Sequence, residues 1–552
     1  MKKVVSVAVA AMLAGTSLAA FAGCGSKVDS ESPETLEVYV CNLGYGYAWA
    51  EQMLEDFAQE DWVKEKYPNL QIDFAQDAVE QNSKNWLENN STNYDVIMCT
   101  NLESYLGASE GKTVDLTELV YNKTVPGEDV TFAEKMFDSV LESNRDPDST
   151  AEDPHYYTAT FASGMAGIAY NATVLEELGF EEPNTTDELF AIAESIKTGS
   201  YVAGASGDYM VGQPVDRNVY ASQSAFVTYG VSAYINYTVE TWWAQYEGVG
   251  NYVNYFEGVS DGIAGNSAVT RQTGRLKALE ATDAMMDYTR LYPSAERDAY
   301  RRAQNEVVMG VSLFMANGDW FDMEERDFAA SAPGAGEVRL MNTPVLSSIR
   351  EKTPSIPDDA TLSLIVEAVD NGCNTIEEAA EAYPGLAGKG IKDTDYQTVH
   401  DARMLVYSIG PRHNVVIPEC SPAKELAADF ILYMATDKSL ETYASMTGGA
   451  SLPFDYNYQE NTELWNSFSA MQQQRLELFS DPDLNIMPNV AKYPLVLRGG
   501  FSSWYPCENP GYEFQTNGST AQEVYDEIIE YWTENNSSRF RIACSQAGIS
   551  IG

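Results

Sequence analysis

The segment between Leu36 and Cys99 constrains the fold most, because strand and helix patterns alternate along it. Strands are predicted over 36–41, 70–74 and 94–99, and the last is a continuous apolar run of the kind found in buried parallel strands. Helices are predicted between them, over 48–66 and around 83–88. This βαβαβ order predicts an open α/β sheet, whose ligands bind beyond the strand ends, here near 42–47 and 100–103.

The length of the chain predicts more than one lobe. From Cys24 onward it has 529 residues, more than one hydrophobic core usually supports. Further helices are predicted over 274–291, from Pro422 to about 435 with Ser421 as N-cap, and over 521–532. The stretch VVMGVSLFMANGDWF predicts a strand running into a turn, and 403–409 predicts another strand. Residues 350–398 are polar and predict an irregular insertion.

The first residues have the order of a secretory signal: Lys2 and Lys3, an apolar run over 4–18, then Ala22 and Gly23 before Cys24. The sequence FAGC resembles the bacterial lipobox, in which the cysteine thiol is diacylated, so Cys24 is the predicted lipidation site. A transmembrane anchor is the alternative, but the run is short and rich in Ala, Gly and Ser. Residues 25–34 are polar and aperiodic, as expected of a tether.

Charge and cysteine usage exclude several kinds of partner. The formal charge of −48 disfavours nucleic acid and anionic ligands, although it says little about a neutral sugar. Six cysteines follow Cys24, without a CxxC pair or a spacing typical of metal ligands, so neither a metal site nor a cofactor is predicted. Whether these six form disulfides or stay as buried free thiols is left open by the sequence.

Six segments, taken in order, resemble one known family over nearly the whole mature chain. They are YDVIMC (94–99), KTVDL (112–116), the run from HYYTATF to TTDEL (155–189), FMANGDWF (314–321), SPAKELAADFILYMAT (421–436) and MPNVAKYPLVLRGGFSSWY (487–505). In this order they are similar to the extracellular solute-binding proteins of family 1, the maltose-binding-like sugar receptors of ABC importers.

This resemblance implies the two-lobe α/β fold called periplasmic-binding-protein-like II, with a hinge between the lobes. It assigns 35–158 plus about 399–440 to the first lobe, and about 159–349 plus 441–552 to the second; the insertion over 350–398 stays unassigned. The resemblance implies a monomer, and it implies a binding protein and not an enzyme. The implied protein binds a carbohydrate, most simply an oligosaccharide, and delivers it to the ABC permease from the extracytoplasmic face of the cell membrane, where its lipid anchor holds it.

A sugar receptor needs flat aromatic faces for C–H groups and polar side chains for hydroxyls. The candidate ligand-binding residues are Tyr45, Tyr47, Asn101, Glu103, Tyr220, Trp243, Asp319, Trp320, Arg498 and Trp504. Trp320 and Trp504 are the leading two, because they lie in the motifs that present binding-site aromatics in the family. The alternatives are core packing for the aromatic residues, helix capping for the acids and an ion pair for Arg498.

Three other functions stay open. A secreted glycoside hydrolase would also use acids and aromatics, but among 82 acids a chance carboxylate pair carries little information. The chain has three histidines and no GxSxG, HExxH or phosphate-binding motif. The same fold could bind a polyamine or a peptide, and a purely adhesive surface lipoprotein would leave the order of motifs unexplained.

Overall fold

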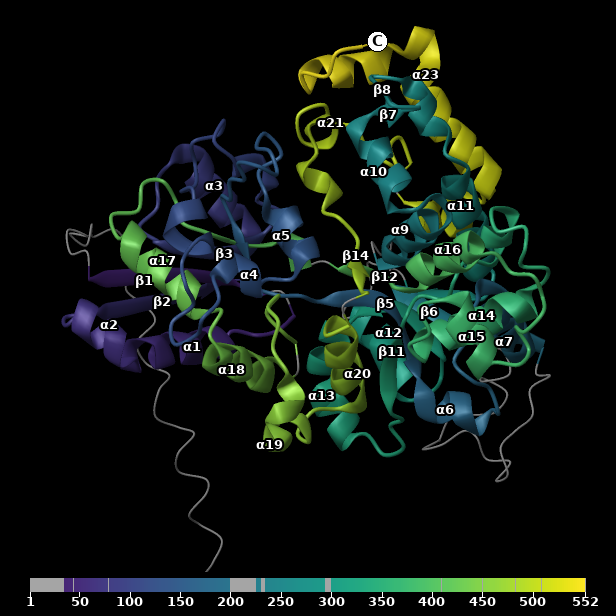
Figure 1. Ribbon diagram of the computed structural model, residues 1–552, viewed down its shortest axis with the longest axis horizontal. Helices are drawn as coiled ribbons and strands as arrows, with labels where there is room; N and C mark the ends of the chain where they lie inside the picture. Colours follow the sequence, from purple (N-terminus) through teal and green to yellow (C-terminus); the bar gives the residue numbers. More distant parts are fainter. Residues whose placement is uncertain are drawn as a thin grey trace, which may run out of the picture.

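The fold is that of a computed structural model, shown in Figure 1. It describes residues 34–551 except 43, 78, 199–224, 230–233, 293–298, 409, 449, 482 and 508. The predicted signal segment, Cys24 and Tyr220 lie outside the described residues. Two α/β lobes lie side by side, and the C-terminal segments project from the second lobe at the top of the view.

The first lobe is built on a sheet with the strand order β2-β1-β3-β13-β4. Its strands are β1 (Thr35–Cys41), β2 (Gln71–Asp77), β3 (Val96–Thr100), β4 (Ala159–Thr160) and β13 (His413–Val416). β1 runs parallel to both β2 and β3, which confirms the predicted βαβαβ order, while β13 runs antiparallel to β3 and β4. The lobe's helices are α1 (Ala48–Gln59), α2 (Asp61–Lys66), α3 (Glu80–Asn89), α4 (Phe132–Lys135), α5 (Asp138–Asn144), α17 (Lys424–Tyr433) and α18 (Asp437–Thr447).

Two predictions for this lobe need correction. The single helix over 48–66 breaks at Glu60, whose backbone is extended, and the break lets Trp62 pack edge-to-face on Phe57 at 5.7 Å. Ser421 does not cap α17, which begins at Lys424. Its hydroxyl instead donates to Asp95 Oδ1 at 2.6 Å and accepts from the Ala423 amide. Asp95 directly precedes β3 and lies beside Ser421.

The second lobe is built on a sheet with the order β14-β12-β5-β10-β6-β9, and β11 also pairs with β5. Its strands are β5 (Met165–Asn171), β6 (Phe226–Tyr229), β9 (Thr289–Tyr292), β10 (Phe314–Gly318), β11 (Val338–Met341), β12 (Leu405–Ser408) and β14 (Asn485–Ile486). β5 and β10 are buried along their whole lengths, as the central pair of a covered sheet should be.

Helices cover this sheet and form the projection above it. Those on the lobe are α6 (Ala172–Glu177), α7 (Thr186–Thr198), α9 (Tyr234–Glu247), α11 (Thr273–Met286), α12 (Ala299–Val308), α13 (Trp320–Ser331), α19 (Thr462–Trp465), α20 (Ala470–Phe479) and α22 (Pro510–Tyr512). The projection contains α10 (Val249–Glu257), the hairpin β7 (Val259–Ser260) and β8 (Ile263–Ala264), α21 (Pro494–Leu497) and α23 (Ala521–Gln546) (Figure 1). The helix predicted over 274–291 therefore ends at Met286, because residues 289–292 pair with β6 as β9.

The insertion over 350–398 was predicted to be irregular, and that prediction is wrong. It contains α14 (Asp359–Asp370), α15 (Ile376–Ala382) and α16 (Asp393–Arg403) around a core of its own. Leu362, Ile365, Val366 and Val369 lie on one face of α14 at helical spacing and are buried in that core. Figure 1 shows these helices on the outer side of the second lobe.

The chain passes between the lobes where hydrogen bonds tie its crossing segments together. The Ser163 amide donates to the Ser451 carbonyl at 2.8 Å, and the Ser408 hydroxyl donates to the Gly164 carbonyl. Residues 399–408 were predicted to belong to the first lobe. The return crossing lies between β12 in the second sheet and β13 in the first, so these residues belong to the second lobe instead.

Of the described residues, no helix is both long and apolar enough to cross a membrane.

Candidate ligand-binding site

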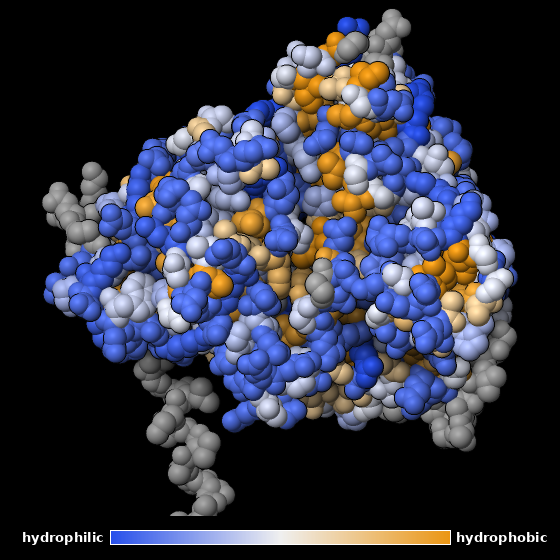
Figure 2. Space-filling view, in the orientation of Figure 1, coloured by the Kyte–Doolittle hydropathy of each residue, from blue (hydrophilic) through white to orange (hydrophobic). Residues whose placement is uncertain are grey.

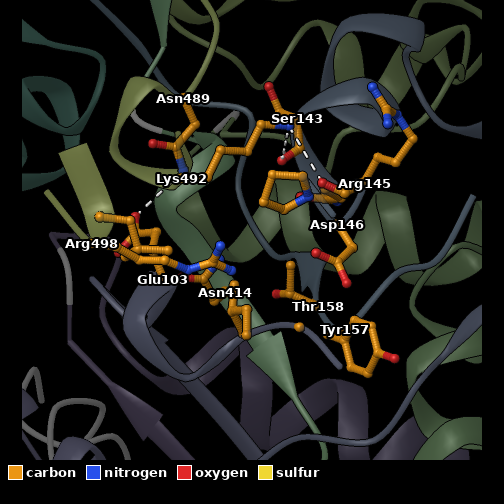
Figure 3. Close-up of a pocket in the computed structure, with 15 residues that line it drawn as sticks. Glu103, Ser143, Arg145, Asp146, Tyr157, Thr158, Asn414, Asn489, Lys492 and Arg498 are labelled. Atoms are coloured by element: carbon orange, nitrogen blue, oxygen red, sulfur yellow. Dashed lines mark hydrogen bonds between the residues drawn. The ribbon is translucent and has the colours of Figure 1, made fainter. Parts of the chain in front are cut away.

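The candidate site lies along the boundary between the two lobes, where Figure 2 shows apolar surface gathered in a groove. A small cavity there is lined by Glu103, Asp146 and Asn414 of the first lobe and by Asn489 and Arg498 of the second (Figure 3). Its volume is about 30 Å³. That volume holds one or two water molecules, so a larger ligand enters this cavity only if the lobes separate.

Three side chains of the second lobe close this end of the boundary, and we call their interactions the closing contacts (Figure 3). Asn489 Nδ2 donates to Glu103 Oε1 at 3.4 Å. Lys492 Nζ donates to the Glu142 carbonyl at 2.7 Å, at the C-terminal end of α5, where a cation is favoured. Arg498 Nη2 pairs with Asp148 Oδ2 at 2.6 Å. Arg498 therefore joins the lobes by an ion pair, which was the alternative to its predicted ligand contact.

Burial lowers the pKa of Lys492 to about 8, against the attraction of Glu142. When the lobes separate, this side chain enters water, where a lysine pKa is about 10.4. Closing therefore releases a proton between pH 8 and 10.4, and we expect the closing equilibrium to favour the closed form about tenfold more at pH 9 than at pH 7. Small-angle scattering across this range measures the effect. Lys492→Met should abolish it, and a pH response that survives in this variant would contradict the assignment.

A cluster of aromatic side chains occupies the second-lobe side of the boundary. We call Tyr234, Tyr237, Trp320 and Tyr407 the aromatic platform. The Tyr237 ring centroid lies 5.6 Å from that of Tyr234 and 4.8 Å from that of Tyr407. Trp320 packs edge-to-face on Tyr234 at 5.5 Å. The three tyrosines are half-buried, while Trp320 is 4% exposed. In the described part of the chain, the buried Trp320 indole N–H has no hydrogen-bond acceptor.

Charged and polar groups of the first lobe and of the return crossing lie close to this platform. Arg412 Nε lies 3.4 Å from Glu103 Oε1, and Arg412 also donates to the side-chain oxygen of Asn101. Burial acts to lower the pKa of Arg412, but the nearby Glu103, Tyr407 and Tyr237 raise it, so the guanidinium lies close to groups of both lobes. The site therefore combines aromatic faces with hydrogen-bonding groups on opposite sides of one boundary.

Glu240 lies on α9 behind the platform and accepts from the Tyr252 hydroxyl at 3.1 Å. Burial raises its pKa from 4.5 to about 6. The folded protein thus holds this proton more tightly than the unfolded chain does, so its stabilising contribution is present below pH 4.5 and is lost as the pH rises through 6.

Glu240→Gln removes the charge but keeps the shape and the acceptor oxygen for Tyr252. We expect it to raise the free energy of unfolding at pH 8 by about 2 kcal/mol and to leave it unchanged at pH 4. Denaturant unfolding of both proteins at the two pH values tests this. The exposed residue Glu377 offers the control variant Glu377→Gln, which should change stability at neither pH. Destabilisation by Glu240→Gln at pH 8 would contradict the expectation.

Tyr45 and Asp319 come together at the hinge and not on the aromatic platform. The Tyr45 hydroxyl donates to Asp319 Oδ1 at 3.1 Å, and Arg475 Nε lies 3.2 Å from Asp319 Oδ2. The Met165 amide also donates to Asp319. Burial raises the pKa of Asp319, while the positive charge of Arg475 acts to lower it. Because the carboxylate oxygens already have these partners, this cluster is structural in the closed form.

Trp243 and Trp504 lie in the core of the second lobe, and here the expected ligand contact needs correction. Trp243 is completely buried, and its indole N–H donates to Gln272 Oε1 at 2.7 Å. Trp504 is 8% exposed and packs 6.4 Å from Trp243. The Trp243 ring also contacts Tyr252, Tyr255 and Phe256, so it has no free face for a ligand.

The remaining predicted residues lie near the boundary. Tyr47 is half-buried directly before α1, and Asn101 has the left-handed φ of 58° that asparagine tolerates.

Sequence reasoning missed Tyr234, Tyr237 and Arg412. The two tyrosines are three residues apart in an aromatic-rich stretch, a helical spacing that places them on one face. Arg412 follows the predicted strand over 403–409, so the rule that ligands bind at strand ends could have found it.

No protein-family model matches this sequence, and no curated protein matches it. Solved structures match its fold. The chain is similar to a chitin oligosaccharide binding protein with a TM-score of 0.53 at 13% identity, over 91% of this chain and 99% of that chain. The solute receptor AcbH, described with an exclusive preference for β-D-galactopyranose, gives 0.53 at 9% identity, over 93% and 99%.

The GacH receptor of Streptomyces glaucescens, solved without ligand and with acarbose, gives a TM-score of 0.50 at 14% identity, over 91% of this chain and 97% of that chain. These similarities extend over both lobes, so they concern the whole architecture and not one shared domain. The chain has the two-lobe α/β fold of the periplasmic solute-binding proteins.

Proposed function

We propose that this protein is the carbohydrate receptor of an ABC importer and that it binds an oligosaccharide between its lobes without catalysing a reaction. The observation that carries the proposal is the aromatic platform facing Arg412 and Glu103 across the lobe boundary. Pyranose rings have apolar C–H faces that stack on aromatic rings, and their hydroxyls pair with charged and amide groups. A sugar hydroxyl would also give the Trp320 indole N–H the acceptor that it lacks among the described residues.

The proposed mechanism is a hinged clamp. Because the cavity beside the closing contacts has a volume of only about 30 Å³, a sugar reaches that end of the boundary after the lobes separate. Hinge rotation at Ser163 and Ser451 then brings the platform onto the ligand, and the closing contacts hold the lobes together. The closed shape would be what the permease recognises. The proposal includes a monomer held at the extracytoplasmic face of the membrane through diacylated Cys24.

A thermal-shift screen over oligosaccharides, amino acids, peptides and polyamines tests the ligand class. A ligand that binds only the folded protein stabilises it by about 2.7 kcal/mol at a concentration of 100 times its Kd. We expect stabilisation by an oligosaccharide. Stabilisation by a peptide or polyamine alone would contradict the proposal, and release of reducing ends from the stabilising sugar would indicate a hydrolase.

A polyamine receptor is the nearest alternative, because carboxylates and aromatic rings also bind cations. Arg412 argues against it, since its guanidinium already pairs with Glu103 at 3.4 Å and lies near the tyrosines of the platform, the groups that a cationic ligand would use. The positive charges of Arg412 and of a polyamine bound beside it would repel each other.

The lipid anchor has its own test. In bacterial cells grown with a labelled fatty acid, we expect the label on the wild-type protein and its loss in Cys24→Ala, which should be released from the membrane fraction. A Cys24→Ala protein that stays labelled and membrane-bound would contradict lipidation at this residue.

A further inference from the structure

Cys41 and Cys99 lie opposite each other on neighbouring parallel strands of the first lobe. The register of β1 and β3 pairs Val40 with Met98, so the two cysteines are the next pair along. Residues aligned in this way point to the same side of a sheet. Their sulfur atoms are 2.8 Å apart, and both side chains are buried. In the described parts of the chain, no other pair of cysteines has its sulfur atoms in contact.

The backbone at this position suits a covalent link. Neighbouring strands are about 4.8 Å apart, which lies within the range of roughly 4.4–6.8 Å between the Cα atoms of disulfide-bonded cysteines.

The pair of Cys41 and Cys99 also differs chemically from an ordinary buried pair of thiols. Ser83, from α3, donates from its hydroxyl to Cys99 Sγ at 3.1 Å. Hydrogen bonds from Cys41 and Ser83 lower the pKa of Cys99, while the same contact raises that of Cys41. Cys99 is therefore the better nucleophile.

We propose that Cys41 and Cys99 form a reversible disulfide in the presence of a low-molecular-weight disulfide such as oxidised glutathione. The Cys99 thiolate attacks one sulfur of the oxidant, forms a mixed disulfide and releases one thiolate, which takes up a proton. Cys41 loses its proton to solvent, and its sulfur attacks Cys99 Sγ and releases the second thiolate. The two protein thiols are oxidised, and the oxidant is reduced to two thiols.

The link would join the two strands directly beneath the loops of the candidate site. Asn42 follows Cys41, while Thr100 and Asn101 follow Cys99. Asn101 in turn accepts from Arg412, so the crosslink at Cys99 lies two residues before the polar side of the boundary. A link between residues 58 positions apart also restricts the unfolded chain. For a loop of this length we expect the melting temperature of the oxidised protein to be higher by roughly 5 °C.

The full chain carrying Cys24→Ala, which removes the proposed lipidation site and its thiol, is unfolded in denaturant and refolded in mixtures of reduced and oxidised glutathione, so that burial of the thiols does not limit the reaction. Free thiols are then alkylated, and peptides are identified by mass spectrometry. The expected result is one crosslinked pair of peptides containing Cys41 and Cys99, with Cys373, Cys420, Cys507 and Cys544 alkylated. Alkylation of Cys41 and Cys99 in the most oxidising mixture would overturn the proposal, and so would a crosslink that joins either of them to another cysteine.

Three variants separate the crosslink from general effects of oxidation. Cys41→Ser and Cys99→Ser should each lose the crosslink and the rise in melting temperature that oxidation causes. Cys420→Ser should keep both, because this cysteine lies before α17 and has no sulfur partner among the described cysteines. An equal rise on oxidation in Cys41→Ser would overturn the proposal. This inference does not depend on the identity of the ligand.

Discussion

Tyr237→Ala is expected to weaken carbohydrate binding about 100-fold, or ~2.7 kcal/mol. The Tyr237 ring lies between Tyr234 and Tyr407 and meets Trp320 edge-to-face at 6.2 Å, so it is the member of the platform that contacts all the others. Its removal takes away a stacking surface and lets the flanking rings rotate. Aromatic residues at the centre of a binding site commonly contribute 2 kcal/mol or more. Calorimetric titration with the sugar that stabilises the wild type most strongly measures the change.

Two further variants sharpen this test. Tyr237→Phe keeps the ring and removes the hydroxyl, so we expect its affinity to stay within about tenfold of the wild type. Tyr383→Ala removes a tyrosine from the insertion, which lies on the outer side of the second lobe, and should leave binding unchanged. If Tyr237→Ala binds the sugar within twofold of the wild type while remaining folded, the platform is not the binding surface.

Asp319→Ala is expected to destabilise the fold by about 3–5 kcal/mol, because it leaves the Arg475 guanidinium buried without its counter-ion. Arg475 is 2% exposed, so bulk water does not solvate its charge once the carboxylate is removed. The variant also removes the acceptor for the Tyr45 hydroxyl, which comes from the other lobe. Urea unfolding at pH 7 measures the loss of stability.

The exposed ion pair between Arg539 and Glu534 provides a matched control. Its Nη1–Oε2 distance is 3.2 Å, close to that of the buried pair, but both side chains are more than 40% exposed. Arg539→Ala should therefore cost less than about 1 kcal/mol. Similar costs for Asp319→Ala and Arg539→Ala would show that burial does not govern the strength of the hinge ion pair.

Much of the fold could be predicted from local patterns. The strands near 36–41 and 94–99 form because runs of apolar and β-branched residues fill a covered sheet, and this requirement is visible in the sequence itself. The same kind of pattern was present in the insertion, where Leu362, Ile365 and Val366 have helical spacing. It was overlooked because the surrounding residues are polar.

The site was harder to predict, because the sequence shows which residues lie near strand ends but not which of them are already occupied. Asp319 follows β10, as a ligand contact should, yet its carboxylate is engaged by Arg475, which is 156 positions away in the sequence. Trp243 is as aromatic as Trp320, and only the packing of α9 against α10 decides that it faces the core.

The sequence by itself determined the α/β class, because hydrophobic periodicity is a local property of the chain. Chain length predicted more than one lobe, and the number two came from the resemblance to the solute-binding family. The tertiary structure alone decided that Tyr237 on α9 meets Tyr407 on β12, and that Arg412 reaches Glu103 from a crossing segment. Such contacts depend on how the two sheets are placed against each other. That placement is set by packing between residues hundreds of positions apart, which no local pattern encodes.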